Sequence, residues 1–120
     1  MILLVEDDAD IRSLFEAGLS VHGYAVETAS NGRDALAMME RMAELPVVIV
    51  CDLHMPVMDG WQLLTALADT PRLASIPVIV LTAADDPSRR APRPTTMLIK
   101  PVAMGDLLTA IEAAARSSQV

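Results

Sequence analysis

The sequence predicts an α/β fold in which helices cover both faces of a parallel β-sheet, and three observations support this prediction. Apolar runs at residues 2–5, 47–51 and 77–81 show no polar alternation, which is typical of strands buried on both faces. The segments between these runs carry apolar residues at helical spacing. Strand and helix alternate along the chain, which indicates βα units with right-handed crossovers in a doubly wound sheet.

The N-terminal half supplies the first two units. Residues 2–5 form a buried strand, and residues 9–21 place their apolar side chains on one helical face. Residues 25–29 alternate enough between apolar and polar side chains to predict a strand at the edge of the sheet. Residues 33–43 form the next helix, and we interpret its methionines as core filler.

The C-terminal half continues the alternation. Residues 47–52 predict a buried central strand, and residues 61–68 predict the helix that follows it. Residues 77–82 and 97–100 predict two further buried strands, and residues 105–116 predict the closing helix. The whole pattern therefore contains five strands.

The segment between the last two strands lacks a helical pattern. It contains Pro87, Pro92 and Pro94, and a proline in a helix interior costs about 3 kcal/mol. Almost no apolar residue lies between Asp85 and Thr96, so no amphipathic face is available to cover the sheet. We expect a loop with at most one helical turn here.

Composition excludes several classes of protein. The 120 residues fit a single domain, which we place at residues 1–120. The net charge of −7 argues against direct nucleic-acid binding, because phosphate contacts need clustered Lys and Arg. No apolar run reaches the roughly 20 residues of a membrane span, and the N-terminus lacks the basic start of a signal sequence. We expect a cytoplasmic protein without membrane contact, in which the single Cys51 is a core residue.

Four of the predicted strands end in polar side chains. Glu6 and Asp7 follow the first strand, Asp52 ends the central one, and Thr82 and Lys100 end the last two. Each has an ordinary explanation, since acids cap helices and Asp or Thr can open a loop. The carboxyl ends of parallel strands, however, meet at one edge of a sheet, where ligands bind. We therefore expect these side chains to form one site.

This set of side chains suits phosphoryl transfer to a carboxylate, which needs an exposed nucleophile, a metal ion and further donors. Asp52 is the only acid at the end of a central strand, so it is the candidate nucleophile. Glu6 and Asp7 would hold Mg²⁺, and a backbone carbonyl just past Asp52 could add another oxygen. Lys100 would act as a point charge on the phosphoryl group, and Thr82 would donate a hydrogen bond.

Four motifs resemble, in order, those of the receiver domain of response regulators in two-component signalling. They are Val5-Glu6-Asp7-Asp8, Asp52-Leu53-His54-Met55-Pro56-Val57-Met58-Asp59-Gly60, Leu81-Thr82-Ala83 and Lys100-Pro101. The resemblance covers essentially the whole chain. It implies a flavodoxin-like fold, as in chemotaxis regulators, with a five-stranded parallel sheet in the order 2-1-3-4-5. The family's fourth helix would be shortened or absent in this chain.

The resemblance also implies a donor, an acceptor and a metal site. Asp52 would accept a phosphoryl group from the phosphohistidine of a histidine kinase or a histidine phosphotransfer protein. Mg²⁺ would be held by Glu6, Asp7, Asp52 and the backbone carbonyl of His54. The protein would then be a signalling switch that catalyses only its own phosphorylation and dephosphorylation, and not a turnover enzyme.

At the other end of the site, the resemblance makes Thr82 the switch hydroxyl and Lys100 the contact to the phosphoryl group. It also implies a cis bond between Lys100 and Pro101. The family commonly has an aromatic switch residue three positions before the lysine, where this chain has Met97. We therefore do not expect the usual coupling of Thr82 to a swinging ring. In most relatives the fourth helix helps to form the output or dimer surface, so its shortening here predicts that the protein signals through another face.

Two function classes stay open. One is a phospho-accepting switch that alters the binding of a downstream effector protein or domain. The other is an interaction module that keeps the receiver fold without phosphate-driven switching. A phosphatase with an aspartate nucleophile would want a second acid two residues beyond Asp52, where His54 stands. The ring of His54 either influences water access to the acyl phosphate or is an exposed loop side chain, and the oligomeric state is open.

Overall fold

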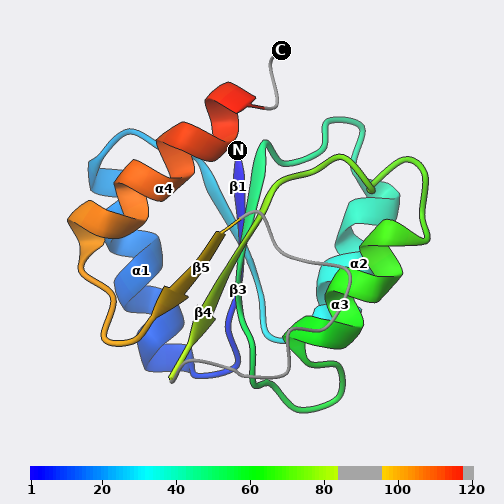
Figure 1. Ribbon diagram of the computed structural model, residues 1–120, viewed down its shortest axis with the longest axis horizontal. Coiled ribbons are helices and arrows are strands. Elements are labelled where there is room, and N and C mark those ends of the chain that lie inside the picture. The colour runs from blue at the N-terminus through cyan, green and yellow to red at the C-terminus, as the bar shows by residue number, and fades with distance from the viewer. Residues whose placement is uncertain (84–95, 118–120) are drawn as a thin grey trace.

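The computed structural model describes residues 1–83 and 96–117, and it shows a parallel sheet between two layers of helices (Figure 1). The strands lie in the order β2-β1-β3-β4-β5. In Figure 1, α1 and α4 lie on one face of the sheet, and α2 and α3 lie on the other. The elements of the described part of the chain are β1 (Ile2–Val5), α1 (Ala9–Val21), β2 (Val26–Ala29), α2 (Gly32–Arg41), β3 (Val48–Asp52), α3 (Gly60–Ala68), β4 (Val78–Thr82), β5 (Thr96–Ile99) and α4 (Met104–Ser117). The predicted doubly wound fold and strand order are confirmed.

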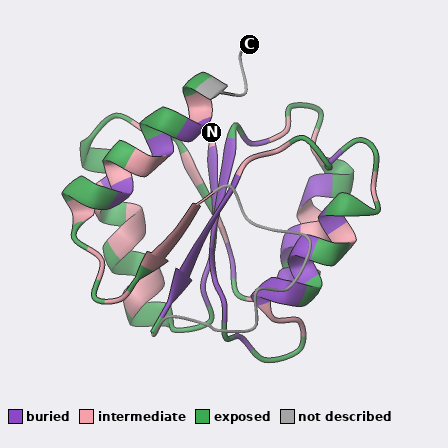
Figure 2. Ribbon diagram, viewed as in Figure 1, coloured by how far each residue is buried: buried purple, intermediate pink, exposed green. Residues whose placement is uncertain are grey.

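The sheet separates two apolar cores, and this explains the uninterrupted apolar runs. Side chains alternate across a strand, so Leu3 and Val5 pack against α2 and α3, while Ile2 and Leu4 pack on the side of α1 and α4. Both faces of β1, β3 and β4 are buried over their whole length (Figure 2). A strand covered on both faces has no position at which a polar side chain would reach water.

The register places the polar strand ends at one edge. Asp52 lies opposite Leu81 of the neighbouring strand, and Thr82 lies opposite Ile99, directly before Lys100. Because all pairings are parallel, the carboxyl ends of β1, β3, β4 and β5 meet at the same edge of the sheet. None of the helices within residues 1–83 and 96–117 has the length and apolar character to cross a bilayer.

Two predicted details are wrong. The helix expected at residues 33–43 ends at Arg41, because Arg72 donates hydrogen bonds to the carbonyls of Met39 and Met42 at its end. The last strand was expected to be buried, yet β5 is only partly covered and Ile99 is 54% exposed. The reason is that β5 lies at the edge of the sheet, where it has a single neighbour. The loop predicted between the last two strands falls on residues 84–95, outside the described residues, and stays a prediction.

Candidate functional site

Three acids meet at the carboxyl edge of the sheet. Glu6 and Asp7 follow β1 directly, and Asp52 is the last residue of β3. One carboxylate oxygen from each of the three lies within 4.8 Å of the others. Glu6 is 3% exposed and Asp52 is 6% exposed, whereas Asp7 is open to solvent. The structure thus brings together the three side chains that the sequence proposes as metal ligands.

The third acid in the run after β1 has a different role. The carboxylate of Asp8 accepts hydrogen bonds from the backbone N–H groups of Asp10 and Ile11, at 2.9 and 3.0 Å. Asp8 is therefore the N-cap of α1, which satisfies two of the helix's free N–H groups. Helix capping accounts for Asp8 alone, so the presence of Glu6 and Asp7 needs another explanation.

Both carboxylate oxygens of Asp52 accept hydrogen bonds. The Lys100 ammonium donates to Oδ2 at 2.8 Å, and the backbone N–H of His54 donates to Oδ1 at 3.2 Å. The sequence predicts an exposed nucleophile, and this is wrong, because Asp52 is largely buried at the end of β3. Its contacts with Lys100 and with the loop after β3 account for part of this burial.

Glu6 is buried beside the charge of Asp52, and both effects disfavour its ionised form. Burial, together with the hydrogen bond to Asp52 and the charge of Asp52, raises the pKa of Glu6 to about 7, against the opposing effect of Lys100. A divalent cation would remove this repulsion and favour the ionised carboxylate. Carboxylate oxygens are also the ligands that Mg²⁺ prefers in proteins. The donor set of Glu6, Asp7 and Asp52 therefore fits Mg²⁺.

Thr82 and Lys100 lie at the neighbouring strand ends, as predicted. Thr82 is buried at the end of β4, and its backbone carbonyl accepts a hydrogen bond from the Lys100 N–H at 2.7 Å. The bond between Lys100 and Pro101 is cis, as the sequence resemblance implies. The site therefore has one ammonium in direct contact with Asp52 and one hydroxyl residue on the adjacent strand.

The loop after Asp52 is fixed by two residues of its motif. Asp59 caps α3 by accepting from the Gln62 N–H at 2.9 Å, and the Gln62 side chain accepts from the Asp59 N–H at 3.0 Å. A Cβ on Gly60 would lie 2.9 Å from the Leu53 Cα, so only glycine allows the start of α3 to pack on the end of β3. His54 is exposed on this loop, which fits the ordinary interpretation of its ring.

Sequence reasoning missed Arg12. Its guanidinium Nη1 donates a hydrogen bond to the backbone carbonyl of Glu6 at 2.8 Å. The available signal was a basic residue at the end of the first turn of a helix that directly follows an acidic run. The partner of Arg12 is a backbone carbonyl, so the sequence contains no matching acidic side chain that would point to the contact. The sequence signal for this contact is therefore weak.

Residues 2–112 match the family described as "Response regulator receiver domain". The chain belongs to the receiver-domain family. Receiver domains bind Mg²⁺ at an acidic pocket, and Glu6, Asp7 and Asp52 form an acidic cluster in this one. Response regulators in general interact with histidine kinases and downstream effectors. This receiver domain thus belongs to two-component signalling.

Individual relatives support the assignment of the chain to this family. The receiver domain is 36% identical over 122 residues to "Response regulator MprA" of Mycobacterium leprae, covering 98% of this chain and 52% of that protein. It is 45% identical over 85 residues to "Response regulator PleD" of Caulobacter vibrioides, covering 70% of this chain and 18% of that protein. The chain spans 61% or less of the length of five curated relatives that it matches. The placement of a single domain at residues 1–120 stays a prediction.

Solved structures show the same fold. The receiver domain of a histidine kinase from Syntrophus aciditrophicus has a TM-score of 0.88 at 30% identity, covering 97% of this chain and 89% of that chain. The chemotaxis response regulator CheY4 of Vibrio cholerae has a TM-score of 0.84 at 32% identity, covering 94% of this chain and 96% of that chain.

Proposed function

We propose that this receiver domain is a phosphorylation switch in which Asp52 accepts a phosphoryl group from a phosphohistidine. The donor would be a histidine kinase or a histidine phosphotransfer protein, and the phosphorylated state would alter binding of a downstream effector. The observation that carries the proposal is the 2.8 Å contact of Lys100 with a carboxylate that also faces two further acids. A lone ion pair would not need the two repelling acids beside it.

In the transfer, a carboxylate oxygen of Asp52 forms a bond to phosphorus while the bond from phosphorus to the donor's imidazole nitrogen breaks. The electron pair of the broken bond stays on the imidazole. Lys100 already lies within hydrogen-bond distance of Asp52, so its ammonium can also meet a phosphoryl oxygen. Thr82, on the adjacent strand end, supplies the hydroxyl that would sense the new group.

Mg²⁺, when bound, would supply positive charge to the phosphoryl oxygens during transfer. Glu6, Asp7 and Asp52 would hold it with the backbone carbonyl of His54. These residues would keep the ion beside the acceptor carboxylate.

Incubation with acetyl phosphate and Mg²⁺, followed by intact-mass measurement, tests the proposal. We expect the mass to rise by one phosphoryl group in the native chain and to stay unchanged in Asp52→Asn. Chelation of Mg²⁺ should suppress the modification. If neither acetyl phosphate nor a cognate kinase yields a phosphorylated species, the proposal is wrong.

One observation favours the second candidate, an interaction module without phosphate-driven switching. Met97 stands at the position of the family's aromatic switch residue, and it packs against the core on the side of α2 and α3. A flexible thioether lacks the hydroxyl or ring edge that could exchange one polar contact for another. If Asp52 becomes phosphorylated but the chemical shifts of Thr82 and Met97 do not change, this second function is favoured.

A further inference from the structure

The loop that carries Glu6 and Asp7 is held in place from outside the acidic site. We propose that Arg12 is a positioning residue, whose guanidinium fixes this loop in the shape that lets both acids share one divalent cation with Asp52. This inference rests on the proposed function and adds a residue to its metal site. Arg12 contacts no ligand oxygen, and it acts through the backbone of Glu6.

Hydrogen bonds hold the peptide groups around Glu6 on both sides. The Glu6 N–H donates to the carbonyl of Ala29 in β2 at 3.0 Å. The Glu6 carbonyl accepts from Arg12 Nη1 at 2.8 Å, and the Arg12 N–H donates to the Asp8 carbonyl at 2.9 Å. The loop is therefore tied to the sheet at its start and to the first turn of α1 at its end.

Asp7 depends on these ties for its position. It is exposed between Glu6 and Asp8, so its backbone conformation follows from that of its two neighbours. Mg²⁺ requires near-octahedral geometry at about 2.0–2.1 Å, and it tolerates displaced ligands poorly. Loss of a partner that orients metal ligands commonly costs about 10- to 100-fold in affinity. Removal of the Arg12 guanidinium should therefore weaken Mg²⁺ binding.

The charge of Arg12 alone predicts the opposite result. A positive charge near a cation site repels the cation, so neutralising it should strengthen Mg²⁺ binding. A positioning role and a purely electrostatic role thus differ in the sign of the change. This difference makes the inference testable without a measurement of phosphorylation.

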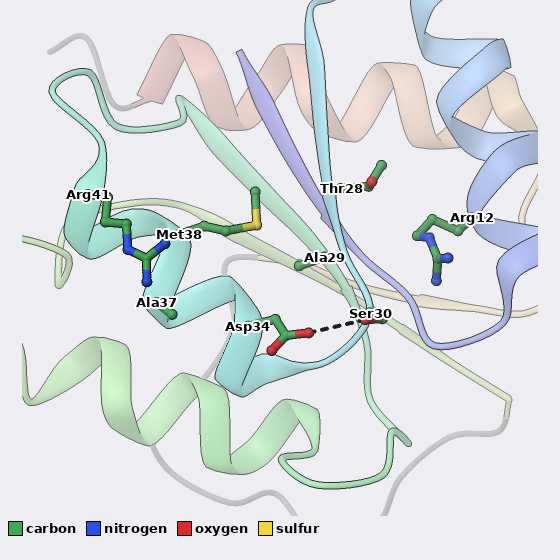
Figure 3. Close-up of a pocket in the computed structure, with 8 residues that line it drawn as sticks. All are labelled: Arg12, Thr28, Ala29, Ser30, Asp34, Ala37, Met38 and Arg41. Carbon is green, nitrogen blue, oxygen red and sulfur yellow. Dashed lines mark hydrogen bonds between the residues drawn. The ribbon is translucent and has the colours of Figure 1, made fainter.

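The chain offers a matched control in Arg41. Arg12 and Arg41 lie toward opposite ends of a groove of about 450 Å³ beside β2, with Thr28 and Ser30 between them (Figure 3). Within the described residues, the side chain of Arg41 makes no hydrogen bond or ion pair, whereas that of Arg12 contacts the loop. Replacing either arginine by glutamine removes the same charge from the same groove.

Calorimetric titration with Mg²⁺ measures the affinity for the ion. We would titrate the native chain, Arg12→Gln, Arg12→Lys and Arg41→Gln, and record the metal-free melting temperature of each to show that it is folded. We expect Arg12→Gln to bind Mg²⁺ about tenfold more weakly or worse. Arg12→Lys, which keeps the charge but offers a shorter reach without the planar fork, should lie between. Arg41→Gln should bind as the native chain or slightly more tightly. Equal or tighter binding by a folded Arg12→Gln overturns the inference, and Arg12→Lys decides it if the glutamine variant does not fold.

A second readout separates this inference from the proposed function. If the native chain itself binds no Mg²⁺, the metal site of the proposed function is wrong. Hydrogen exchange of the metal-free protein then still tests the positioning role, because Arg12→Gln should speed exchange at the amides of residues 6–8 while Arg41→Gln should not. Unchanged exchange in Arg12→Gln would overturn the inference independently of any metal.

Discussion

Val57 has a positive φ of 70° in the loop that follows Asp52, and its side chain is 65% exposed. The Met58 N–H donates to the Pro56 carbonyl at 2.7 Å, so Val57 is the centre of a tight three-residue turn. A β-branched side chain is strained in this region, at a cost of about 1–2 kcal/mol. Glycine avoids this strain. Part of the resulting gain in stability is offset, because glycine has more conformational freedom in the unfolded chain.

We expect Val57→Gly to raise the free energy of unfolding by about 0.5–1 kcal/mol. Urea unfolding measures the change, and Val57→Ala is the control, because alanine loses the branch but keeps the Cβ. Lower stability of the glycine variant than of the alanine variant would contradict the argument.

The raised pKa of Glu6 predicts that the stability of the metal-free protein depends on pH. This pKa is raised from 4.5 to about 7, so between these values the folded state binds more protons than the unfolded state. The free energy of unfolding should therefore fall as pH rises from about 4.5 to about 7, by at most roughly 3 kcal/mol from this group. Glu6→Gln should remove this contribution, giving a flatter profile.

Urea unfolding at pH 5 and pH 7.5 in the presence of a chelator tests this expectation. Mg²⁺ should reverse the trend, since it binds the ionised carboxylate and competes with the proton. An identical fall in the native chain and in Glu6→Gln would show that another group causes it.

At the scale of single residues, the sequence shows which side chains belong to the site more readily than it shows how buried they are or what they contact. Asp52, Lys100 and Thr82 could be predicted because each ends an apolar run, and strand ends meet at one edge. The burial of Asp52 could not, since it depends on contacts with residues far along the chain. The contact of Arg12 could not be predicted for a related reason. Its partner is a backbone carbonyl, a group that every residue carries.

At the scale of elements, the contact between α3 and β3 depends on Gly60. A Cβ at this position would lie 2.9 Å from the Leu53 Cα and 3.1 Å from the Asp52 carbonyl oxygen. Both atoms are backbone, so no side chain can move aside, and the helix or the strand end must shift. We expect Gly60→Ala to lower the free energy of unfolding by about 1–3 kcal/mol, and to weaken Mg²⁺ binding through the displaced Asp52.

Gly105 is the matched control for this substitution. It lies in α4, where a Cβ would meet no atom of another described element within 4 Å, so alanine there meets open space. Gly105→Ala should be neutral or stabilising by up to about 1 kcal/mol, because alanine favours the helix. Urea unfolding compares the two variants, and equal stability changes would show that helix propensity, not close packing, governs Gly60.

Element boundaries were predictable where the cause is local. Asp8 and Asp59 cap their helices from adjacent positions, and the predicted starts of α1 and α3 agree with the structure within one residue. The end of α2 was misplaced because Arg72, some thirty residues later, binds its last carbonyls. The exposure of β5 was missed because a run of apolar residues does not reveal whether its strand is central or at the edge.

At the scale of the whole molecule, the order of the strands decides which side chains meet. Alternating strands and helices predict a parallel sheet, but local patterns do not say which strands are neighbours. That order came from the resemblance of four motifs, and β1 beside β3 is the pairing that places Glu6 and Asp7 near Asp52. Residues 45 or more positions apart in the sequence therefore contribute to one acidic cluster.

A cation that binds this cluster should stabilise the whole fold, because the cluster exists only when β1 and β3 are paired. Mg²⁺ at about 100 times its dissociation constant should add roughly 2.7 kcal/mol to the free energy of unfolding and raise the melting temperature.

Asp7→Asn should abolish most of this rise in melting temperature. Asp8→Asn should retain it, because asparagine caps α1 as well as aspartate does, and it removes the same charge from the residue next to Asp7. Thermal unfolding with and without Mg²⁺ separates the two variants. Equal loss in both would mean that general negative charge attracts the ion, and equal retention would exclude Asp7 as a ligand.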